Sequence, residues 1–287
     1  MPAVQWGRRP LTTQLVDFHI VRHFYLTGKS EPTFQTPQRG YPTSMLVALH
    51  GFTETDQVWS EFFANHLPVR CPVLPGHGAK PCPPGTTLAS TAADLVKNLA
   101  VLGTDDLLGY SLGGRVALQL AIDHPGRVRR LVLISSGPGI ADANERAKRL
   151  LRDERLAQIL EEDGISPFTA WWESSPALRP GRPLSRQIDE SLRSLRLNQD
   201  PRCLAGVLRH LSHGAMEDLS PRLAKLTIPV LLVAGDSDRA YCQRMREMAA
   251  ALPNSRLQLI ADAGHAVHRE KPEAVRNAVI TFLRETA

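Results

Sequence analysis

The sequence predicts an α/β fold in which a mostly parallel sheet is covered by helices on both faces. Short apolar runs alternate with segments of helical periodicity, which is typical of such sheets. The chain has 287 residues, 43% hydrophobic and 22% charged, so it can bury a substantial core. Between about Ser135 and Leu226 the alternation stops, which predicts an inserted segment of a different kind.

Seven segments have the short apolar character of strands. The first of them, together with the proline-rich stretch Pro32–Pro42, is expected to form an edge hairpin ahead of the core. The predicted strands are Val16–Leu26, Met45–Leu49, Val69–Leu74, Asp106–Gly109, Arg130–Ile134, Pro229–Ala234 and Arg256–Ile260.

Helices are expected between the strands, because parallel neighbours need a crossover connection. Their apolar residues recur at helical spacing. The predicted core helices are Asp56–His66, Thr91–Leu102, Gly113–His124, Tyr241–Leu252 and Pro272–Arg284.

The inserted segment has no clear buried strand but several amphipathic stretches separated by proline and glycine. These stretches are Ala143–Leu160, Pro167–Trp172, Ser185–Arg196 and Pro201–Leu211. We interpret the segment as a helical cap over the end of the sheet. The predicted organisation is one core, residues 1–134 and 227–287, with one cap, residues 135–226.

Composition and charge narrow the class of protein. The net charge is +5, from 34 basic and 29 acidic residues, but the arginines are mixed with acids rather than gathered in the basic stripe of a nucleic-acid-binding protein. No apolar run could span a bilayer, and Met1–Pro10 precedes no stretch of signal-peptide length. The four cysteines lie far apart with no C-x-x-C pair, which argues against a zinc site or disulfide framework. We expect a cytoplasmic protein without nucleic-acid or membrane partners; nothing in the sequence specifies an oligomeric state.

The strongest chemical signal is a serine between two glycines, Gly109-Tyr110-Ser111-Leu112-Gly113, after an apolar run and before a helical segment. A nucleophile elbow requires this strand–turn–helix context, and its glycines leave room for a tight turn. Ser111 is then expected in a strained conformation, with its Oγ exposed at the positive end of the following helix. The alternative interpretation is a glycine-rich turn without chemistry.

An acid and a histidine follow in the order that such a serine needs. Asp236-Ser237-Asp238 and Gly264-His265 each follow a predicted strand, at the edge where parallel sheets place their sites. His265 can accept the Ser111 proton through one ring nitrogen while a carboxylate orients the other. Asp238 fits the usual spacing better, and Asp236 is the alternative. His265 could also be an ordinary residue of a surface loop.

An oxyanion hole needs two backbone N–H donors. Leu112, directly after the serine, would supply one, and Phe52 in the segment His50-Gly51-Phe52 would supply the other. His50 is expected to organise its loop rather than act as a base. His77, within Pro75-Gly76-His77-Gly78, is expected to be structural.

Arg115 follows Ser111 by four residues, about one helical turn, so its side chain can point back towards the serine. A guanidinium there is costly to desolvate unless an anion meets it. This favours a substrate with carboxylates, which guanidinium binds in bidentate geometry. The alternative is that Arg115 pairs with an acidic neighbour or reaches solvent. Arg149 and Arg196 stand among other arginines on helix faces and indicate a substrate contact more weakly.

The order of these motifs resembles the α/β-hydrolase superfamily over nearly the whole chain. Several stretches are more narrowly similar to the 2-succinyl-6-hydroxy-2,4-cyclohexadiene-1-carboxylate synthase family of menaquinone and phylloquinone biosynthesis. They are Gly109–Arg115, Gly137–Gly139 with Glu145–Arg149, Trp171-Trp172 before Pro176, and Gly264-His265 with His268-Arg269-Glu270. The elbow marks the superfamily, and the arginine-bearing cap stretch is more specific.

That family eliminates pyruvate from 2-succinyl-5-enolpyruvyl-6-hydroxy-3-cyclohexene-1-carboxylate with the triad serine as a base. The resemblance therefore implies a carbon–oxygen lyase that acts on a small polycarboxylate without an acyl-enzyme, metal or cofactor. The implied site residues are Ser111, Asp238 and His265 as triad, Phe52 and Leu112 as oxyanion-hole donors, and Tyr110, Arg115, Arg149, Arg196 and either Trp171 or Trp172 as substrate-binding residues.

Two departures from the family leave room for a different substrate. Val73-Leu74-Pro75 lacks the Asp that often precedes this proline by two residues, and Met1 to about Leu15 resembles an extension. The alternative function is a carboxylesterase or a carbon–carbon hydrolase that uses the same triad, and a third is a non-catalytic relative that binds a ligand or partner. Arginines that converge on the pocket would favour the lyase, whereas arginines that point to solvent would favour the esterase.

Overall fold

The structure is a computed structural model that describes residues 45–99, 105–175, 178 and 180–286. The chain divides into two compact units, residues 1–41 and 42–287, and every described residue belongs to the second. The predicted strand Val16–Leu26 and the predicted edge hairpin lie outside the described residues.

The strands of the described residues form one parallel sheet in the order β2-β1-β3-β4-β5-β6. They are β1 (Leu46–Leu49), β2 (Val69–Arg70), β3 (Asp105–Tyr110), β4 (Val128–Ile134), β5 (Val230–Gly235) and β6 (Ser255–Ile260). β1, β3 and β5 are buried along their whole length, as expected for a sheet covered on both faces. The predicted fold class is confirmed.

β2 is shorter than the predicted strand Val69–Leu74. Pro72 has no N–H to donate to a neighbouring strand, so it ends the hydrogen-bonded ladder. Beyond it, the Leu74 N–H donates to His50 Nε2 instead of to a strand. Only Leu74 of this run is fully buried, so the apolar run indicated neither the length of the strand nor burial along it.

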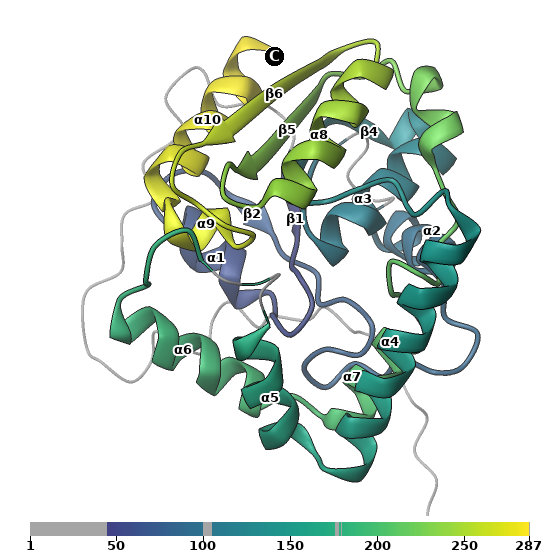
Figure 1. Cartoon of the computed structure of the whole chain (residues 1–287). Coiled ribbons are helices and arrows are strands. Elements are labelled where there is room, and N and C mark those ends of the chain that lie inside the picture. The colour runs from purple at the N-terminus through teal and green to yellow at the C-terminus, as the bar shows by residue number, and fades with distance from the viewer. Residues whose placement is uncertain (1–44, 100–104, 176–177, 179, 287) are drawn as a thin grey trace, which may run out of the picture. The chain divides into compact units, whose positions relative to one another are not determined.

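Helices cover both faces of the sheet (Figure 1). The core helices are α1 (Gln57–Phe63), α2 (Leu88–Leu99), α3 (Leu112–Asp123), α8 (Arg239–Ala251), α9 (Val267–Glu270) and α10 (Pro272–Glu285). Residues of α2, α3 and α8 share one apolar cluster with the sheet, and residues of α1 and α10 share another. The sheet thus separates two cores, which hold its carboxyl edge in place.

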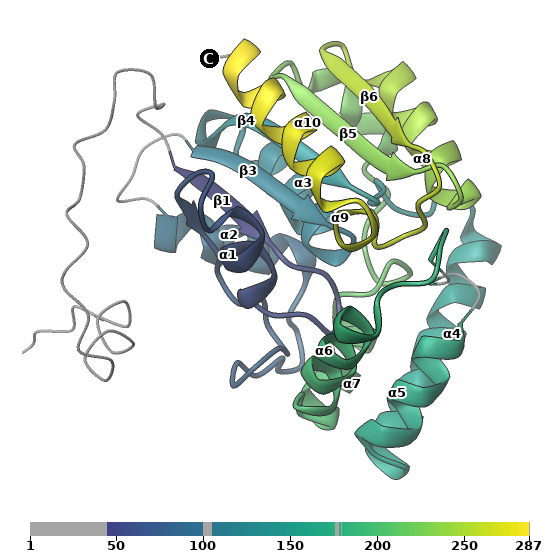
Figure 2. The same ribbon diagram turned by 90° about the vertical axis from the view of Figure 1, so that its left-hand side faces the viewer.

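Four further helices lie beyond the carboxyl ends of the strands (Figure 2). They are α4 (Ala143–Glu162), α5 (Ile165–Ser174), α6 (Arg186–Leu197) and α7 (Pro201–His210), all within the predicted cap. α4, α5 and α7 share an apolar cluster of their own that includes Leu160, Phe168 and Leu204. Arg209 joins α7 to α4 through Glu154 and Glu161. None of the helices in the described residues combines the length and apolarity needed to cross a membrane.

Candidate active site

The order of the strands places the candidate site. β2 lies on one side of β1, whereas β3 to β6 lie on the other, so the loops after β1 and β3 diverge. Open α/β sheets bind ligands in the crevice at such a point. β1 and β3 pair with Leu49 opposite Gly109, so the two loops begin side by side. The predicted nucleophile and both predicted oxyanion donors come from these two loops.

Ser111 occupies the sharp turn between β3 and α3. Its backbone has φ 49° and ψ −108°, a left-handed conformation that is strained for a residue with a side chain. A Cβ at Gly109 would lie 2.3 Å from the Gly113 carbonyl oxygen, and a Cβ at Gly113 would lie 2.3 Å from that of Leu49. Both glycines are therefore needed for the turn to close against β1.

Ser111, His265 and Asp238 form a hydrogen-bonded chain. Ser111 Oγ lies 3.1 Å from His265 Nε2, and His265 Nδ1 lies 2.8 Å from Asp238 Oδ2. The His265 and Asp238 side chains are almost completely buried. If His265 Nδ1 carries the proton, Nε2 is free to accept the proton of the serine, as in a nucleophile–base–acid arrangement.

The two candidate acids have different contacts. Asp238 caps the N-terminus of α8, where its Oδ1 accepts the Tyr241 N–H at 3.2 Å, while its Oδ2 faces His265. Asp236 instead accepts the Asp262 N–H at 2.9 Å and so fixes the turn after β6. The structure therefore brings Asp238, and not Asp236, to His265.

The two predicted oxyanion donors lie beside the serine in the wall of one cavity. Leu112 is the first residue of α3, where an N–H has no intrahelical acceptor. The Phe52 N–H donates to no other backbone group within the described residues. Its ring packs against His77 and against Phe168 and Trp172 of the cap, which anchors the loop that carries this N–H.

His50 and His77 hold the loops around Phe52. His50 Nε2 accepts the Leu74 N–H at 3.0 Å, and His77 Nε2 accepts the Thr53 N–H at 3.2 Å. Their Nδ1 atoms lie 2.8 and 3.0 Å from the carbonyl oxygens of Gly51 and Pro75. Burial lowers the pKa of His50, and burial together with His50 lowers that of His77 to about 3, so both rings stay neutral. Both act as the loop-organising residues that we expected.

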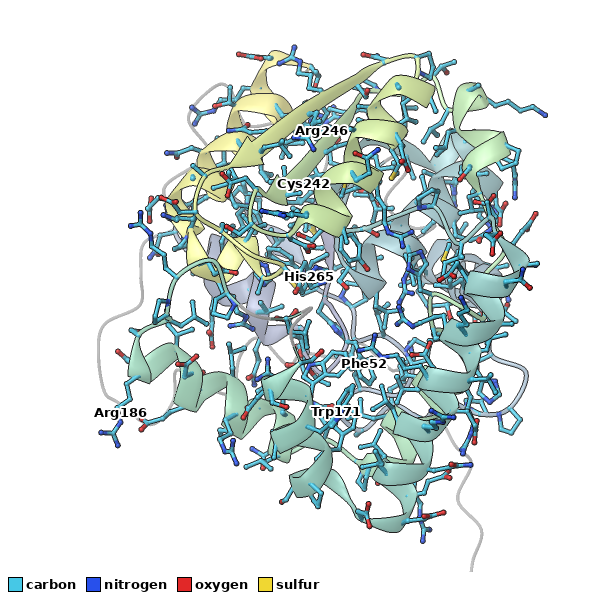
Figure 3. All side chains as sticks on the ribbon, viewed as in Figure 1. Phe52, Trp171, Arg186, Cys242, Arg246 and His265 are labelled. Atoms are coloured by element: carbon cyan, nitrogen blue, oxygen red, sulfur yellow. The ribbon has the colours of Figure 1, made fainter. Side chains whose placement is uncertain are left out.

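A cavity of ≈ 180 Å³ lies between the carboxyl edge of the sheet and the cap. Figure 3 shows His265 where the core meets the cap, with Phe52 and Trp171 on the cap side of it. Most of the charged groups in the wall of this cavity are guanidinium groups. Its lining includes Phe52, Tyr110, Ser111, Leu112, Arg115, Arg149, Arg152, Trp172, Arg196, Tyr241, His265 and Arg269. The three arginines predicted from the sequence thus converge on the cavity that holds Ser111.

Arg115 is 8% exposed, and its side chain has no acidic hydrogen-bond partner among the described residues. Burial lowers the pKa of its guanidinium to about 10, with Arg149 acting in the same direction. The two alternatives considered for Arg115, an acidic partner or exposure to solvent, are therefore not what the structure shows. The buried Asp153, which is paired with Arg149, acts on Arg115 in the opposite direction but is not hydrogen-bonded to it in the described structure. A buried guanidinium without a carboxylate hydrogen-bonded to it is the electrostatic condition for binding an anion.

The cap arginines are already paired. Arg149 Nε lies 2.7 Å from Oδ2 of the buried Asp153, and Arg196 Nη1 lies 3.0 Å from Glu173 Oε1. The Nε of Arg196 is buried without a hydrogen-bond partner in the described structure. These pairs fix the guanidinium groups in the wall and leave other N–H groups of each for a ligand.

The two adjacent tryptophans of α5 lie in different places relative to the cavity. Trp172 lines the cavity and stacks on Phe168 at 5.6 Å between ring centroids. Trp171 is 37% exposed and lies outside the lining, where the Arg152 guanidinium stands 5.7 Å from its ring. The structure therefore brings Trp172, and not Trp171, to the site.

Known proteins are similar to this chain in sequence and in fold. Residues 46–278 match the Alpha/beta hydrolase family. The chain belongs to the α/β-hydrolase family. This confirms the resemblance seen in the sequence, and the chain is an α/β-hydrolase family enzyme.

Among α/β-hydrolase relatives, a protein of Bacillus subtilis is 35% identical over 83% of this chain and 89% of its own length. One from Salmonella arizonae, named 2-succinyl-6-hydroxy-2,4-cyclohexadiene-1-carboxylate synthase, is 31% identical over 86% of this chain and 96% of its own. MenH from S. aureus superposes with a TM-score of 0.81 and 32% identity, covering 86% of this chain and 95% of that one. A malate-bound thermophilic esterase from Thermogutta terrifontis superposes with a TM-score of 0.71 and is 25% identical, covering 85% of this chain and 90% of that one.

Several charged or polar groups of this α/β-hydrolase cavity were not anticipated from the sequence, among them Glu54, Arg152, Asp153, Tyr241 and Arg269. Arg152 follows Arg149 by three residues, so helical spacing could have placed it on the same side of α4. Arg269 belongs to a stretch that we quoted for the resemblance without assigning it a role. Glu54 and Tyr241 carried no signal, because each contacts the site through partners distant in the sequence.

Proposed function

We propose that this protein is a lyase that eliminates pyruvate from 2-succinyl-5-enolpyruvyl-6-hydroxy-3-cyclohexene-1-carboxylate to give 2-succinyl-6-hydroxy-2,4-cyclohexadiene-1-carboxylate. The observation that carries the proposal is a serine–histidine–aspartate chain that opens into a cavity walled by arginines. Similarity to MenH and to the named synthases supports it at the level of the whole chain.

The reaction needs one base. Ser111 removes the proton from the ring carbon that bears the succinyl group, and His265 takes the serine proton, so that the serine oxygen acts as the base. The electron pair of the broken C–H bond forms a new ring double bond, the existing double bond shifts, and the bond to the enolpyruvyl oxygen breaks. The leaving enolate gains a proton and becomes pyruvate. No covalent bond to the enzyme forms at any step.

The developing charge lies on the succinyl carbonyl oxygen next to the deprotonated carbon. The N–H groups of Phe52 and Leu112 would hold it, which stabilises the transition state more than the ground state. Arginines account for the rest of the recognition, since the substrate carries three carboxylates. Arg115, Arg149 and Arg196 would bind them, because each guanidinium faces the cavity with N–H groups to donate.

The test is to prepare the adduct in situ, add the purified protein, and follow both pyruvate and the absorbance of the conjugated diene. We expect the two products to appear together at equal amounts. Ser111→Ala and a reaction without protein are the controls. Pyruvate release that does not depend on Ser111 would contradict the proposal.

The second candidate is hydrolysis of an ester or a carbon–carbon bond by the same residues. The proximity of Ser111 Oγ to His265 Nε2 and the similarity to the thermophilic esterase favour it. A hydrolase would form an acyl-enzyme and consume water. Turnover of small esters, without release of pyruvate from the adduct, would decide for this candidate.

A further inference from the structure

Arg269 is a guanidinium of the cavity wall to which the proposed function gives no part. It lies on the short helix α9 and is mostly buried. Its Nε donates to Glu54 Oε1 at 3.0 Å. Its two Nη groups donate to no side chain or carbonyl of the described residues. They therefore form a planar pair of donors of the kind that binds one carboxylate at two points.

Glu54 fixes the orientation of Arg269. Its side chain is buried, and its other oxygen, Oε2, accepts the Gly51 N–H at 3.0 Å. Burial opposes ionisation of this carboxyl, but Arg269 and His268 hold its pKa well below the usual range. Because both oxygens are engaged, the carboxylate aligns the guanidinium through its Nε edge and leaves the Nη edge free.

Tyr110, Arg196 and Arg269 line the same cavity as Arg115, Arg149 and Tyr241. Burial and Glu54 raise the pKa of the Tyr110 phenol, while the positive charges of Arg269 and Arg196 lower it. Arg149 is likewise the cationic neighbour of Arg115. The rings of Tyr110 and Tyr241 lie 5.5 and 4.5 Å from that of His265. Both tyrosine rings thus lie close to His265, in the same cavity wall as the arginines.

We propose that Arg269 is a fourth carboxylate-binding residue, which with Arg196 forms a second anion subsite on the Tyr110 side of His265. The inference rests on the proposed function, which supplies a substrate with three carboxylates. It adds that one of them binds to Arg269 and Arg196 while another binds to Arg115. A monocarboxylate can fill only one of the two subsites.

The test must avoid leaving Glu54 as an unpaired buried charge. We therefore compare the pair Glu54→Gln/Arg269→Gln with Glu54→Gln alone, since the amides preserve shape and hydrogen bonding. Arg256→Gln is the control, because Arg256 is an exposed, ion-paired arginine of β6 outside the cavity. Loss of a bidentate contact to a carboxylate should raise the KM for the adduct about 10- to 100-fold relative to Glu54→Gln. The kcat should change less than about threefold.

Binding of succinate gives a readout independent of turnover. It can be followed by intrinsic tryptophan fluorescence, since Trp172 lies in the cavity wall. We expect the pair of amides to weaken succinate binding about tenfold and to leave acetate binding, measured in the same way, within about twofold. A fall in kcat with unchanged KM and unchanged succinate binding would overturn the proposal and leave Arg269 as a positioning residue for the Phe52 loop.

Arg269→Lys covers the case in which the pair of amides does not fold. Lysine keeps the charge beside Glu54 but loses the planar fork, so we expect a higher KM with folding retained. An unchanged KM in this variant would also overturn the proposal. If the wild-type protein releases no pyruvate, the lyase proposal fails, and the succinate measurements still decide whether Arg269 binds a carboxylate.

Discussion

The two walls of the cavity are built differently. We call core wall the part formed by Phe52, Ser111, Leu112, Arg115, Tyr241 and His265, and cap wall the part formed by Arg149, Arg152, Trp172 and Arg196. Residues of the core wall follow strands or begin helices, and hydrogen bonds to Asp238 and His265 fix Ser111, Tyr241 and His265. Residues of the cap wall stand on helix faces, and ion pairs fix the guanidinium groups of Arg149 and Arg196.

The difference lies in what each wall leaves unsatisfied. The core wall holds one buried guanidinium without an acidic partner among the described residues, together with backbone N–H groups. The cap wall presents cations whose charge nearby carboxylates already balance in part. An anion should therefore gain more from the core wall per contact, while the cap wall sets where its other carboxylates lie.

The largest effect should come from the core wall. Ser111→Ala removes the proposed base, so kcat for pyruvate release should fall about a thousandfold or more. The fold should persist, because the hydroxyl contributes only its contact with His265, and circular dichroism checks this. Ser237→Ala, which removes an exposed hydroxyl near Asp236, should leave kcat unchanged. A Ser111→Ala variant that keeps a tenth of the activity would exclude the serine as base.

Arg115→Met should weaken binding of the adduct without lowering the stability of the fold. Loss of a charged hydrogen bond to a carboxylate costs about 1.5–3 kcal/mol, so kcat/KM for the adduct should fall about 10- to 100-fold. The melting temperature should stay the same or rise, because an apolar chain of similar length replaces an unpaired buried charge. Hydrolysis of a small neutral ester should change little. Equal losses on both substrates would show that Arg115 shapes the site rather than binding an anion.

The core wall, apart from Tyr241, could be predicted from the sequence because the topology of the sheet decides where its residues lie. Residues that directly follow parallel strands must meet at one edge, so Ser111, Asp238 and His265 were found from their places after predicted strands. The six strands and the core helices followed from apolar periodicity in the same way. The prediction of the length of β2 was wrong, since a proline ends the ladder that hydrophobicity alone would extend, and the short helix α9 was not predicted.

The cap wall could be predicted only in part, because a periodic pattern does not say which face of a helix meets which partner. Trp171 and Trp172 are adjacent and equally apolar, and the sequence left both open. Arg152 escaped notice among other arginines. Glu54 and Arg269 are 215 residues apart, and their contact is invisible until the fold joins the first loop of the core to α9.

Acid should destabilise the protein through the histidines beneath the Phe52 loop. Burial lowers the pKa of His77 to about 3, so the folded state stays neutral there while the unfolded state binds a proton below about pH 6.5. The contribution of the neutral His77 ring to the free energy of unfolding is therefore complete above pH 6.5. It is lost as the pH falls, by about 1.4 kcal/mol per pH unit. Between pH 6 and 5 the free energy of unfolding of His77→Gln, from urea titrations, should fall less steeply than that of the wild type, by about 1 kcal/mol. Parallel slopes would refute this origin of acid sensitivity.

The smallest effect should separate the two tryptophans of α5. Trp172→Leu removes a ring that packs on Phe52 and Phe168 in the cavity wall, and aromatic contacts of this kind contribute about 0.5–1.5 kcal/mol. The KM for the adduct should therefore rise about two- to tenfold, with kcat little changed. Trp171→Leu is the matched comparison, because Trp171 lies outside the cavity lining and contacts it only through the Arg152 guanidinium in the described structure. If the two variants have the same KM, the cap wall contributes to binding through its charges alone, and Trp172 serves only to pack α5 against the core.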